Sequence, residues 1–348
     1  MQFGIFGSAQ ANSSDLPPET GQGFRDYLDY AAEAEALGYV SSFLVEHHFT
    51  GWNQVSATLM LQTALAMRTT TLRLGSAVIV LPWHNPVLLA EQAATLDLVS
   101  GGRLDFGVGK GYRHNEFAGF NIAPDEAEPR FEESIEVMIK AFTSRQRFSH
   151  HGKFWRFDDI VVEPPPSQKP HPPFWVAAGS EASIRRAAQR GFNLILDQYA
   201  SPEVLGRRIA LYRAERKAYG LRGPARIAVA RQAYVANDRA DAEAALERQA
   251  AWTKRTVEVS RAPGAKTGSH VLAYADTPRG TEANALYGTP DEIGRMLEAL
   301  RAVGVDYVIL TLLGGVAQLR RFAREIMPAF GDKPEQRAAA SENETGSA

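Results

Sequence analysis

A carboxylate and two imidazoles follow an apolar run near the N-terminus, in the order Glu46, His47 and His48. Histidine exchanges a proton near neutral pH, and a neighbouring carboxylate fixes its tautomer and raises its pKa. The pattern therefore predicts an acid–base pair at the end of a strand. Two strand-end histidines satisfied by polar neighbours are an alternative. A metal site is disfavoured, because adjacent strand residues point to opposite faces and no spaced partner is evident.

Two glycine-containing turns after later apolar runs are suited to binding phosphate. In the first, three alternate glycines surround Lys110, so the loop offers N–H groups and a cation. It lacks the third glycine of the dinucleotide pattern. In the second, Gly179 precedes Ser180, an expected helix N-cap at which free N–H groups and the helix dipole favour phosphate. A plain glycine-rich turn and an ordinary helix cap are the alternatives.

Small residues and aromatic residues mark two further features. Gly75 and Ala77 in one apolar run let a flat ring approach the backbone, although on the residues alone easier packing is the preferred explanation. Aromatic residues after the strands predict either an apolar pocket or ordinary packing. They are Trp52, Trp83, Tyr112, Phe117 and Phe120.

Strands and helices must alternate to position these residues. Short apolar runs separated by helical periodicity are typical of repeated βα units around a parallel sheet. Their number favours a closed TIM (β/α)8 barrel, an α/β fold whose active site lies at the carboxyl ends of the strands, over an open doubly wound sheet. The eight predicted strands are Gln2–Phe6, Ser42–Glu46, Leu72–Val80, Arg103–Gly109, Phe174–Ala178, Asn193–Leu196, Ile227–Val235 and Asp306–Thr311.

One-sided apolar faces predict outer helices around residues 27–34, 131–142 and 293–300, the last with Met296 on its apolar face. Two segments without periodicity, Ser149–His171 and Ser260–Leu286, predict long loops or lids. The barrel domain is expected over residues 1–330, followed by a disordered polar tail over 331–348.

Composition excludes several classes of protein. A formal net charge of -2 without a basic cluster argues against nucleic-acid binding, so a small-molecule ligand is expected. The chain has no cysteine, which excludes disulfides and a catalytic thiol. The apolar runs are too short to span a membrane, and no signal peptide is evident, so a cytoplasmic protein is expected.

Across residues 1–330 the chain resembles bacterial luciferase and the luciferase-like flavin monooxygenases. The resemblance implies a TIM barrel that uses reduced FMN, supplied by a separate NAD(P)H:flavin reductase. It also implies O2 activation through a C4a-peroxyflavin that oxygenates a small organic substrate, and a homodimer. The matching stretches are Phe3-Gly4, residues 44–50, 77–82 and 100–107, Gly288-Thr289-Pro290, and Ile326-Met327-Pro328.

The resemblance also assigns roles to the site residues. It implies that His47 is catalytic, and with it we interpret Glu46 as the residue that orients His47. The bond between Ala77 and Val78 corresponds to a non-prolyl cis peptide beneath the flavin. The phosphate-binding residues that it implies are Lys110, Gly179, Ser180 and Ser183.

Two departures and two alternatives accompany the resemblance. Lys110 replaces an arginine and so offers a point charge instead of a planar fork. Gly109 stands where luciferase has a reactive cysteine, so neither light emission nor an aldehyde substrate is implied. The segment 260–286 corresponds to a mobile active-site loop of the family. The alternatives are hydride transfer with the deazaflavin F420 on the same barrel, and a non-catalytic flavin-binding accessory subunit.

Overall fold

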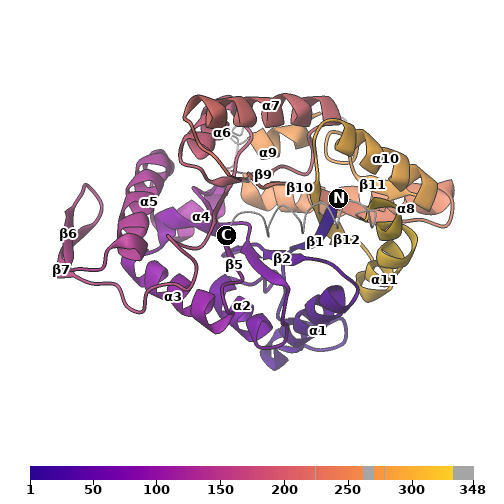
Figure 1. Cartoon of the computed structure of the whole chain (residues 1–348). Helices are drawn as coiled ribbons and strands as arrows, with labels where there is room; N and C mark the ends of the chain where they lie inside the picture. Colours follow the sequence, from indigo (N-terminus) through magenta and orange to yellow (C-terminus); the bar gives the residue numbers. More distant parts are fainter. Residues whose placement is uncertain (224, 262–269, 278, 332–348) are drawn as a thin grey trace.

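The computed structural model describes residues 1–223, 225–261, 270–277 and 279–331. Within them, eight parallel strands close into a barrel with helices around it (Figure 1). The strands pair in the order β1-β2-β3-β5-β8-β9-β10-β12, and β12 pairs again with β1, so the sheet is closed. The predicted TIM barrel is confirmed and the open sheet is excluded. The barrel strands are β1 (Gln2–Gly7), β2 (Ser41–Leu44), β3 (Arg73–Ser76), β5 (Leu104–Gly109), β8 (Phe174–Ala177), β9 (Asn193–Leu196), β10 (Ile227–Val235) and β12 (Tyr307–Leu312).

Two short strands extend the barrel. The single strand predicted over residues 72–80 is divided into β3 and β4 (Ile79–Val80), which are separated by Ala77 and Val78. β3 and β4 both pair with β5, and the register changes by one residue between them. The strand β11 (Leu286–Gly288) pairs with β10 and was not predicted, because three residues are too few to establish a period.

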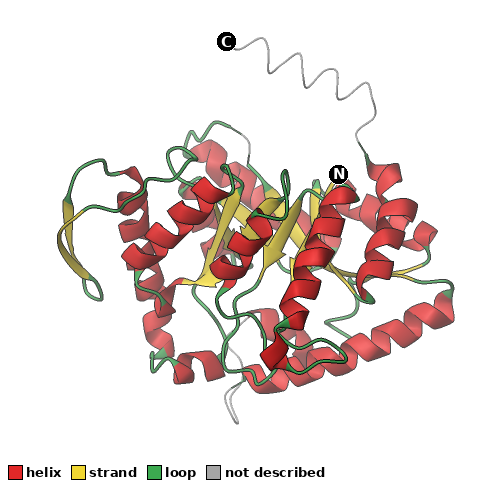
Figure 2. Cartoon of the chain, turned by 90° about the horizontal axis from the view of Figure 1, so that it is seen from below, coloured by secondary structure: helices red, strands yellow, loops and turns green. Residues whose placement is uncertain are grey.

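Helices surround the strands when the barrel is viewed end-on (Figure 1), and Figure 2 shows them running beside the strands in side view. The predicted faces are largely confirmed, since α1 buries Ala31 and Ala34 and α10 buries Ile293 and Leu297. Met296 is 39% exposed, so its predicted place on the apolar face is wrong. The helices are α1 (Gln22–Ala36), α2 (Thr58–Ala66), α3 (Pro86–Val99), α4 (His114–Gly119), α5 (Ala127–Thr143), α6 (Glu181–Gln189), α7 (Pro202–Ala218), α8 (Arg239–Ser260), α9 (His270–Ala273), α10 (Pro290–Ala302) and α11 (Gly315–Glu325).

Aromatic side chains fill the interior of the barrel. Phe43 and Trp175 meet edge to face with ring centroids 5.4 Å apart, and Tyr307 packs on both rings. A Cβ at Gly75 would overlap the Phe43 ring, so this glycine serves packing, as preferred from the sequence. Because the interior is packed, a ligand must bind above it, at one end of the strands.

The amino end of the barrel is closed by an ion-pair cluster. Asp105 is buried and accepts two hydrogen bonds of 2.7 Å from Arg73, and Arg226 lies 3.2 Å from the same carboxylate. The Arg226 guanidinium also lies over the Trp175 ring, 5.0 Å from its centroid. Polar residues at this end of a TIM barrel stabilise the fold, whereas those at the opposite end carry the chemistry.

Both segments predicted as long loops contain regular structure. Residues 149–171 include most of a hairpin, β6 (Phe148–His151) and β7 (Arg156–Ile160), which projects from the barrel beside α5 (Figure 1). Phe148 packs against the core, but the other hairpin side chains are exposed or half-buried, so the sequence shows no clear apolar period. Instead, Glu133 of α5 accepts backbone N–H bonds from Phe154 and Trp155.

The second segment begins at the last residue of α8 and contains α9 and a 3-10 turn, Tyr274–Asp276. Residues 262–269 and 278, at which part of the expected mobile loop falls, lie outside the described residues, as do 332–348 of the predicted tail. Among the described helices, none combines the length and apolar character needed to cross a bilayer.

Candidate functional site

His47 lies on an extended segment that follows β2 at the carboxyl end of the barrel. The backbone N–H of Val45 donates to Gly7 at the end of β1, and the N–H of His47 donates to Val55 at 3.2 Å. The Thr58 hydroxyl at the start of α2 donates to the Val45 carbonyl at 3.0 Å. The segment is therefore held from both sides, and the imidazole has a defined position.

Glu116 of α4 is the carboxylate that orients His47. Its Oε1 lies 3.0 Å from His47 Nδ1 and also accepts the backbone N–H of His48 at 3.0 Å. Glu116 is buried, and Nδ1 of His47 donates to it, so the neutral imidazole keeps its lone pair on Nε2. This arrangement leaves Nε2 as the nitrogen that takes up or releases a proton.

The interpretation of Glu46 as the residue that orients His47 is therefore corrected. Glu46 is buried, and its Oε1 contacts Nε2 of His48 at 2.9 Å and Nε2 of His84 at 2.7 Å. Its other oxygen accepts the backbone N–H of Val80 at 2.7 Å. Side chains of adjacent residues in an extended segment point to opposite sides, so Glu46 and His47 face away from each other.

Burial and charge set the protonation of this group. Burial is the largest influence on His47 and lowers its pKa below 6.5, assisted by the Arg113 charge and opposed by the hydrogen bond to Glu116. His47 is therefore neutral at pH 7. For Glu46, burial acts to raise the pKa, but hydrogen bonds from His48 and His84 outweigh it and the pKa is lowered. Glu46 is therefore an anion between two imidazoles.

Helix α4 brings these groups together, although sequence spacing gives no sign of it. Asn115 donates from its side chain to the carbonyl oxygens of His48 and Phe49, at 3.3 and 3.4 Å, beside the Glu116 contacts. Glu116 stands 69 residues from His47, and an acidic residue in the first turn of a helix is common for reasons of helix polarity. His84 was also missed, since it lies in the turn after β4 and not beside a predicted site.

The Ala77–Val78 peptide bond is cis, the geometry that the resemblance implies. Both residues are half-buried, and Ala77 rests on the aromatic interior of the barrel. A Cβ at Gly109 of β5 would overlap the Val78 side chain. The backbone is therefore closely packed beneath a surface of two small side chains, which suits a flat ring.

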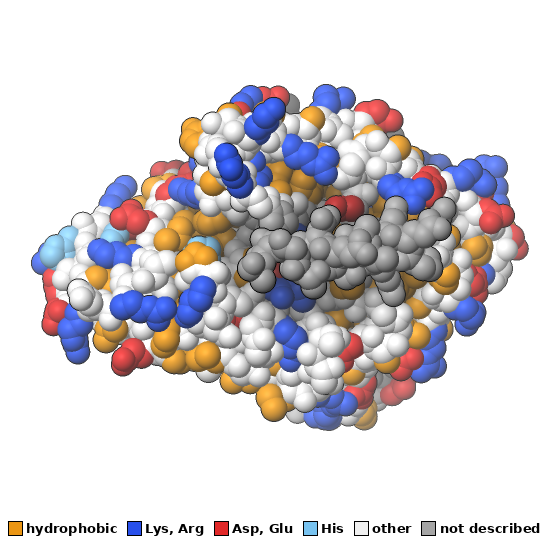
Figure 3. All heavy atoms as spheres, viewed as in Figure 1, with side chains coloured by type: hydrophobic (Ala, Val, Ile, Leu, Met, Phe, Trp, Pro, Cys, Tyr) orange, Lys and Arg blue, Asp and Glu red, His pale blue; other side chains and the backbone are white. Residues whose placement is uncertain are grey.

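Two cations converge at Glu128 in the first turn of α5: Lys110, which follows β5, and Arg186, in the last turn of α6. Lys110 and Arg186 pair with opposite oxygens of Glu128, Arg186 at 2.5 Å. Both cations are half-exposed. Figure 3 views the molecule from the amino end of the barrel, so this cluster, at the carboxyl end, lies on the far face. The expected phosphate-binding cation thus has a second cation and a carboxylate as neighbours.

The second predicted phosphate segment adjoins α6. Ser180 is the N-cap of this helix, and its hydroxyl accepts the N–H of Ser183 at 3.3 Å and lies 2.9 Å from the Ser183 hydroxyl. Gly179 precedes the cap directly after β8. Since Lys110 follows β5, the neighbour of β8, both segments lie at the carboxyl end of the barrel.

Aromatic side chains form a wall beside the histidines. Trp83 stacks on Phe120 with centroids 5.1 Å apart and meets Phe117 edge to face at 5.8 Å, while His48 lies 4.8 Å from Phe120. Phe49 is 57% exposed, so part of the wall is open to solvent. Trp52, by contrast, packs against Trp252 of α8.

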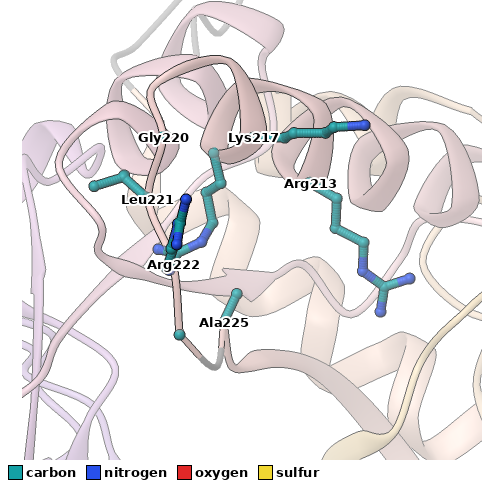
Figure 4. Close-up of a pocket in the computed structure, with 8 residues that line it drawn as sticks. Arg213, Lys217, Gly220, Leu221, Arg222 and Ala225 are labelled. Atoms are coloured by element: carbon teal, nitrogen blue, oxygen red, sulfur yellow. The ribbon is translucent and has the colours of Figure 1, made fainter.

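A basic cavity of about 420 Å³ lies at the opposite end of the barrel (Figure 4). Arg213 and Lys217 at the end of α7 line it together with Arg222 in the following loop. That loop leads to the amino end of β10, so the packed interior separates this cavity from His47. Within the described residues, no group of three or more His, Asp or Glu side chains is placed to hold a metal ion.

A (β/α)8 barrel with a buried, carboxylate-oriented histidine at the carboxyl end of its strands has the architecture of a TIM-barrel enzyme. The model of the luciferase-like monooxygenase family matches residues 1–307. The chain belongs to this family.

Two relatives match over most of their length. The oxygenase component of flavin-dependent trigonelline monooxygenase from Acinetobacter baylyi is 26% identical, over 98% of this chain and 99% of its own. FMNH2-dependent dimethylsulfone monooxygenase from Pseudomonas putida is 28% identical, over 90% and 91%. An uncharacterized protein of Sinorhizobium fredii, y4vJ, is 34% identical, but the match spans only 49% of each chain. The crystal structure of monooxygenase RslO1 from Streptomyces bottropensis is 26% identical, covers 95% of this chain and 100% of its own, and has a TM-score of 0.78.

Proposed function

We propose that this protein is the oxygenase component of a flavin-dependent monooxygenase, which uses reduced FMN and O2 to oxygenate a small organic substrate. A separate NAD(P)H:flavin reductase supplies the reduced FMN. Membership of the luciferase-like family and the two relatives named for flavin or FMNH2 support this function. The observation that carries it is the His47–Glu116 pair at the same end of the barrel as Ala77 and Val78 and the Lys110–Glu128–Arg186 cluster.

The residues present fit FMN. Lys110 and Arg186 share one carboxylate, Glu128, so the cluster keeps a net positive charge, and the α6 N-terminus adds N–H groups and the Ser180 hydroxyl; both features suit a phosphate. The half-buried surface of Ala77 and Val78 suits the ring. Reduced FMN, when bound, supplies the electrons that activate O2 for transfer of an oxygen atom to the substrate.

His47 is the proton-transfer group of this proposal. Its Nδ1 is committed to Glu116, so protons move through Nε2. Its low pKa keeps it neutral, and hence ready to accept a proton, at pH 7. Glu46 acts differently: by binding His48, His84 and the Val80 N–H it fixes the chain on both sides of the platform.

A stopped-flow experiment tests the function. Photoreduced FMN is mixed with O2 in the presence and absence of the protein, and flavin absorbance follows reoxidation. The proposal expects a time course that differs from that of free FMN and that depends on His47. Identical traces with and without protein contradict the proposed function.

Two variants test the role of His47 in the reaction. His47→Ala is expected to bind reduced FMN as the native protein does and to change the reoxidation time course. The matched control is His150→Ala, because His150 also pairs with a glutamate, Glu133 at 3.2 Å, but lies in the hairpin outside the barrel. If His47→Ala behaves like this control, His47 has no part in the reaction.

Two further parts of the proposal come from the sequence. The family resemblance implies a homodimer, and the apolar runs and N-terminal residues favour a cytoplasmic location. The accessory-subunit alternative predicts no turnover until a second subunit is added, and the F420 alternative predicts binding of that deazaflavin in preference to FMN. Binding and turnover assays therefore distinguish these two alternatives from the proposed function.

A further inference from the structure

Arg113 is a buried cation without an anionic partner. It precedes α4 in the loop that follows β5, and only 4% of its surface is exposed. Its Nε and Nη1 are buried and have no hydrogen-bond partner among the described residues. A guanidinium does not lose its proton in proteins, and buried charges are normally paired, so an unpaired buried arginine is costly.

The neighbouring carboxylates do not neutralise this charge. Oε1 of Glu116 is occupied by His47 and His48, and Glu46 is occupied by two histidines and a backbone N–H. No described carboxylate lies within ion-pair distance of Arg113. Among the described residues the guanidinium thus has no counter-ion, and an anionic ligand would supply one.

Position separates this ligand from the flavin phosphate. The phosphate-binding cations Lys110 and Arg186 meet at Glu128, beside α6. Arg113 instead lies close enough to His47 for its charge to lower the pKa of that imidazole. Arg113 thus belongs to the reacting end of the site, where a substrate and not a phosphate is expected.

We propose that Arg113 binds the carboxylate of an organic-acid substrate, whose apolar body lies against the wall formed by Trp83, Phe117 and Phe120. The planar guanidinium matches a carboxylate with two parallel hydrogen bonds, which a neutral amide does not reproduce. The aromatic wall beside His48 offers the apolar contact for the rest of the molecule. This inference names the substrate class and rests on the proposed function.

Ligand titration tests the proposal. Benzoate, phenylacetate and hexanoate are titrated into the native protein by isothermal calorimetry, each beside its neutral amide. We expect at least one acid to bind about tenfold or more tightly than its amide, the ratio expected when one charge-assisted pair is lost. If no acid binds better than its amide, the proposal is overturned.

Variants test whether Arg113 is the cation that binds the acid. Arg113→Gln should abolish the preference for the acid, and Arg113→Lys should keep part of it because the charge remains while the fork is lost. Arg216→Gln is the matched control, since Arg216 is also buried with an unpartnered Nη1 but lies at the amino end of the barrel. It should leave the preference unchanged. An Arg113→Gln protein that keeps the preference overturns the proposal.

A further measurement needs no variant. Binding of benzoate beside Arg113 neutralises the charge that lowers the pKa of His47, so the NMR titration of that imidazole should shift to higher pH when benzoate saturates the site. The absence of a shift would overturn the proposal.

Anaerobic titration with reduced FMN distinguishes the substrate proposal from the proposed function. If the native protein prefers the acid but does not bind reduced FMN, only the proposed function is refuted. If Arg113→Gln keeps the preference for the acid but loses affinity for reduced FMN, Arg113 binds the flavin and the substrate proposal is overturned.

Discussion

Replacement of Glu116 by glutamine perturbs His47 without removing it. The glutamine oxygen still accepts a hydrogen bond from Nδ1 and from the His48 N–H, so the 3.0 Å contacts are preserved in shape. What disappears is the negative charge. Because Glu116 is buried, solvent does not screen this loss. The variant therefore isolates the electrostatic part of the interaction.

The magnitude follows from the type of hydrogen bond. A bond to a charged group contributes about 1.5–3 kcal/mol and a neutral one about 0.5–1.5 kcal/mol, so the difference is about 1–1.5 kcal/mol. Proton binding by His47 should then become about tenfold weaker, since about 1.4 kcal/mol corresponds to a factor of ten. The Glu116→Gln substitution thus lowers further a pKa that burial already places below 6.5.

Two assays read this effect. NMR titration of His47 should move to lower pH in Glu116→Gln, and the pH profile of flavin reoxidation should move with it. Glu116→Asp restores the charge and should restore part of the shift. The matched control is Glu133→Gln, which removes the partner of His150 in the hairpin and should change neither measurement.

Stability should depend on pH in the corresponding direction. Below 6.5 the unfolded chain protonates its histidine while folded His47 resists protonation, so the unfolded state binds more protons and stability falls as the pH falls. The fall should be steeper in Glu116→Gln, as measured by urea unfolding above and below pH 6.5. An unchanged His47 titration in this variant would refute the assignment of Glu116 as the orienting carboxylate.

Three further predictions concern the phosphate segments and the barrel. Lys110→Gln should weaken the binding of reduced FMN about tenfold by loss of a charged contact, while Glu128→Gln should strengthen it by up to about fivefold. In anaerobic titration the affinity for riboflavin, which lacks the phosphate, should change in neither variant. Ser180→Ala removes the α6 cap, so the free energy of unfolding should fall by about 1 kcal/mol, and FMN should bind more weakly with riboflavin again unaffected. Gly107→Ala places a Cβ on the Ser76 carbonyl oxygen and should cost about 1–3 kcal/mol or more in chemical denaturation. Its control, Gly294→Ala, meets no atom within 4 Å and should stabilise α10 by about 0.5–1 kcal/mol.

Sequence periodicity was sufficient for the barrel because each barrel strand contributes its own apolar run. Where the chain forms no core, the same reasoning failed. The hairpin at 148–160 lies outside the barrel and is held by Glu133, so its residues carry no apolar alternation. Met296 shows the same limit on a helix, since an apolar residue at the edge of a face remains accessible to solvent.

The site was predictable where local motifs define it and not where distant segments meet. The location of His47, Lys110 and Ser180 at the carboxyl end of the barrel was predictable because each follows a strand. Glu116 was missed, because its contact with His47 bridges 69 residues and arises only when α4 packs over the end of β2. Arg113 was missed for a related reason, since only the folded structure shows that its guanidinium has no partner.

The most direct test of the central claim is an anaerobic titration of the protein with reduced FMN and, separately, with reduced F420. We predict that reduced FMN binds, that riboflavin binds less tightly, and that Lys110→Gln narrows this difference by about tenfold. Tighter binding of F420 than of reduced FMN, or equal binding of FMN and riboflavin, would contradict it.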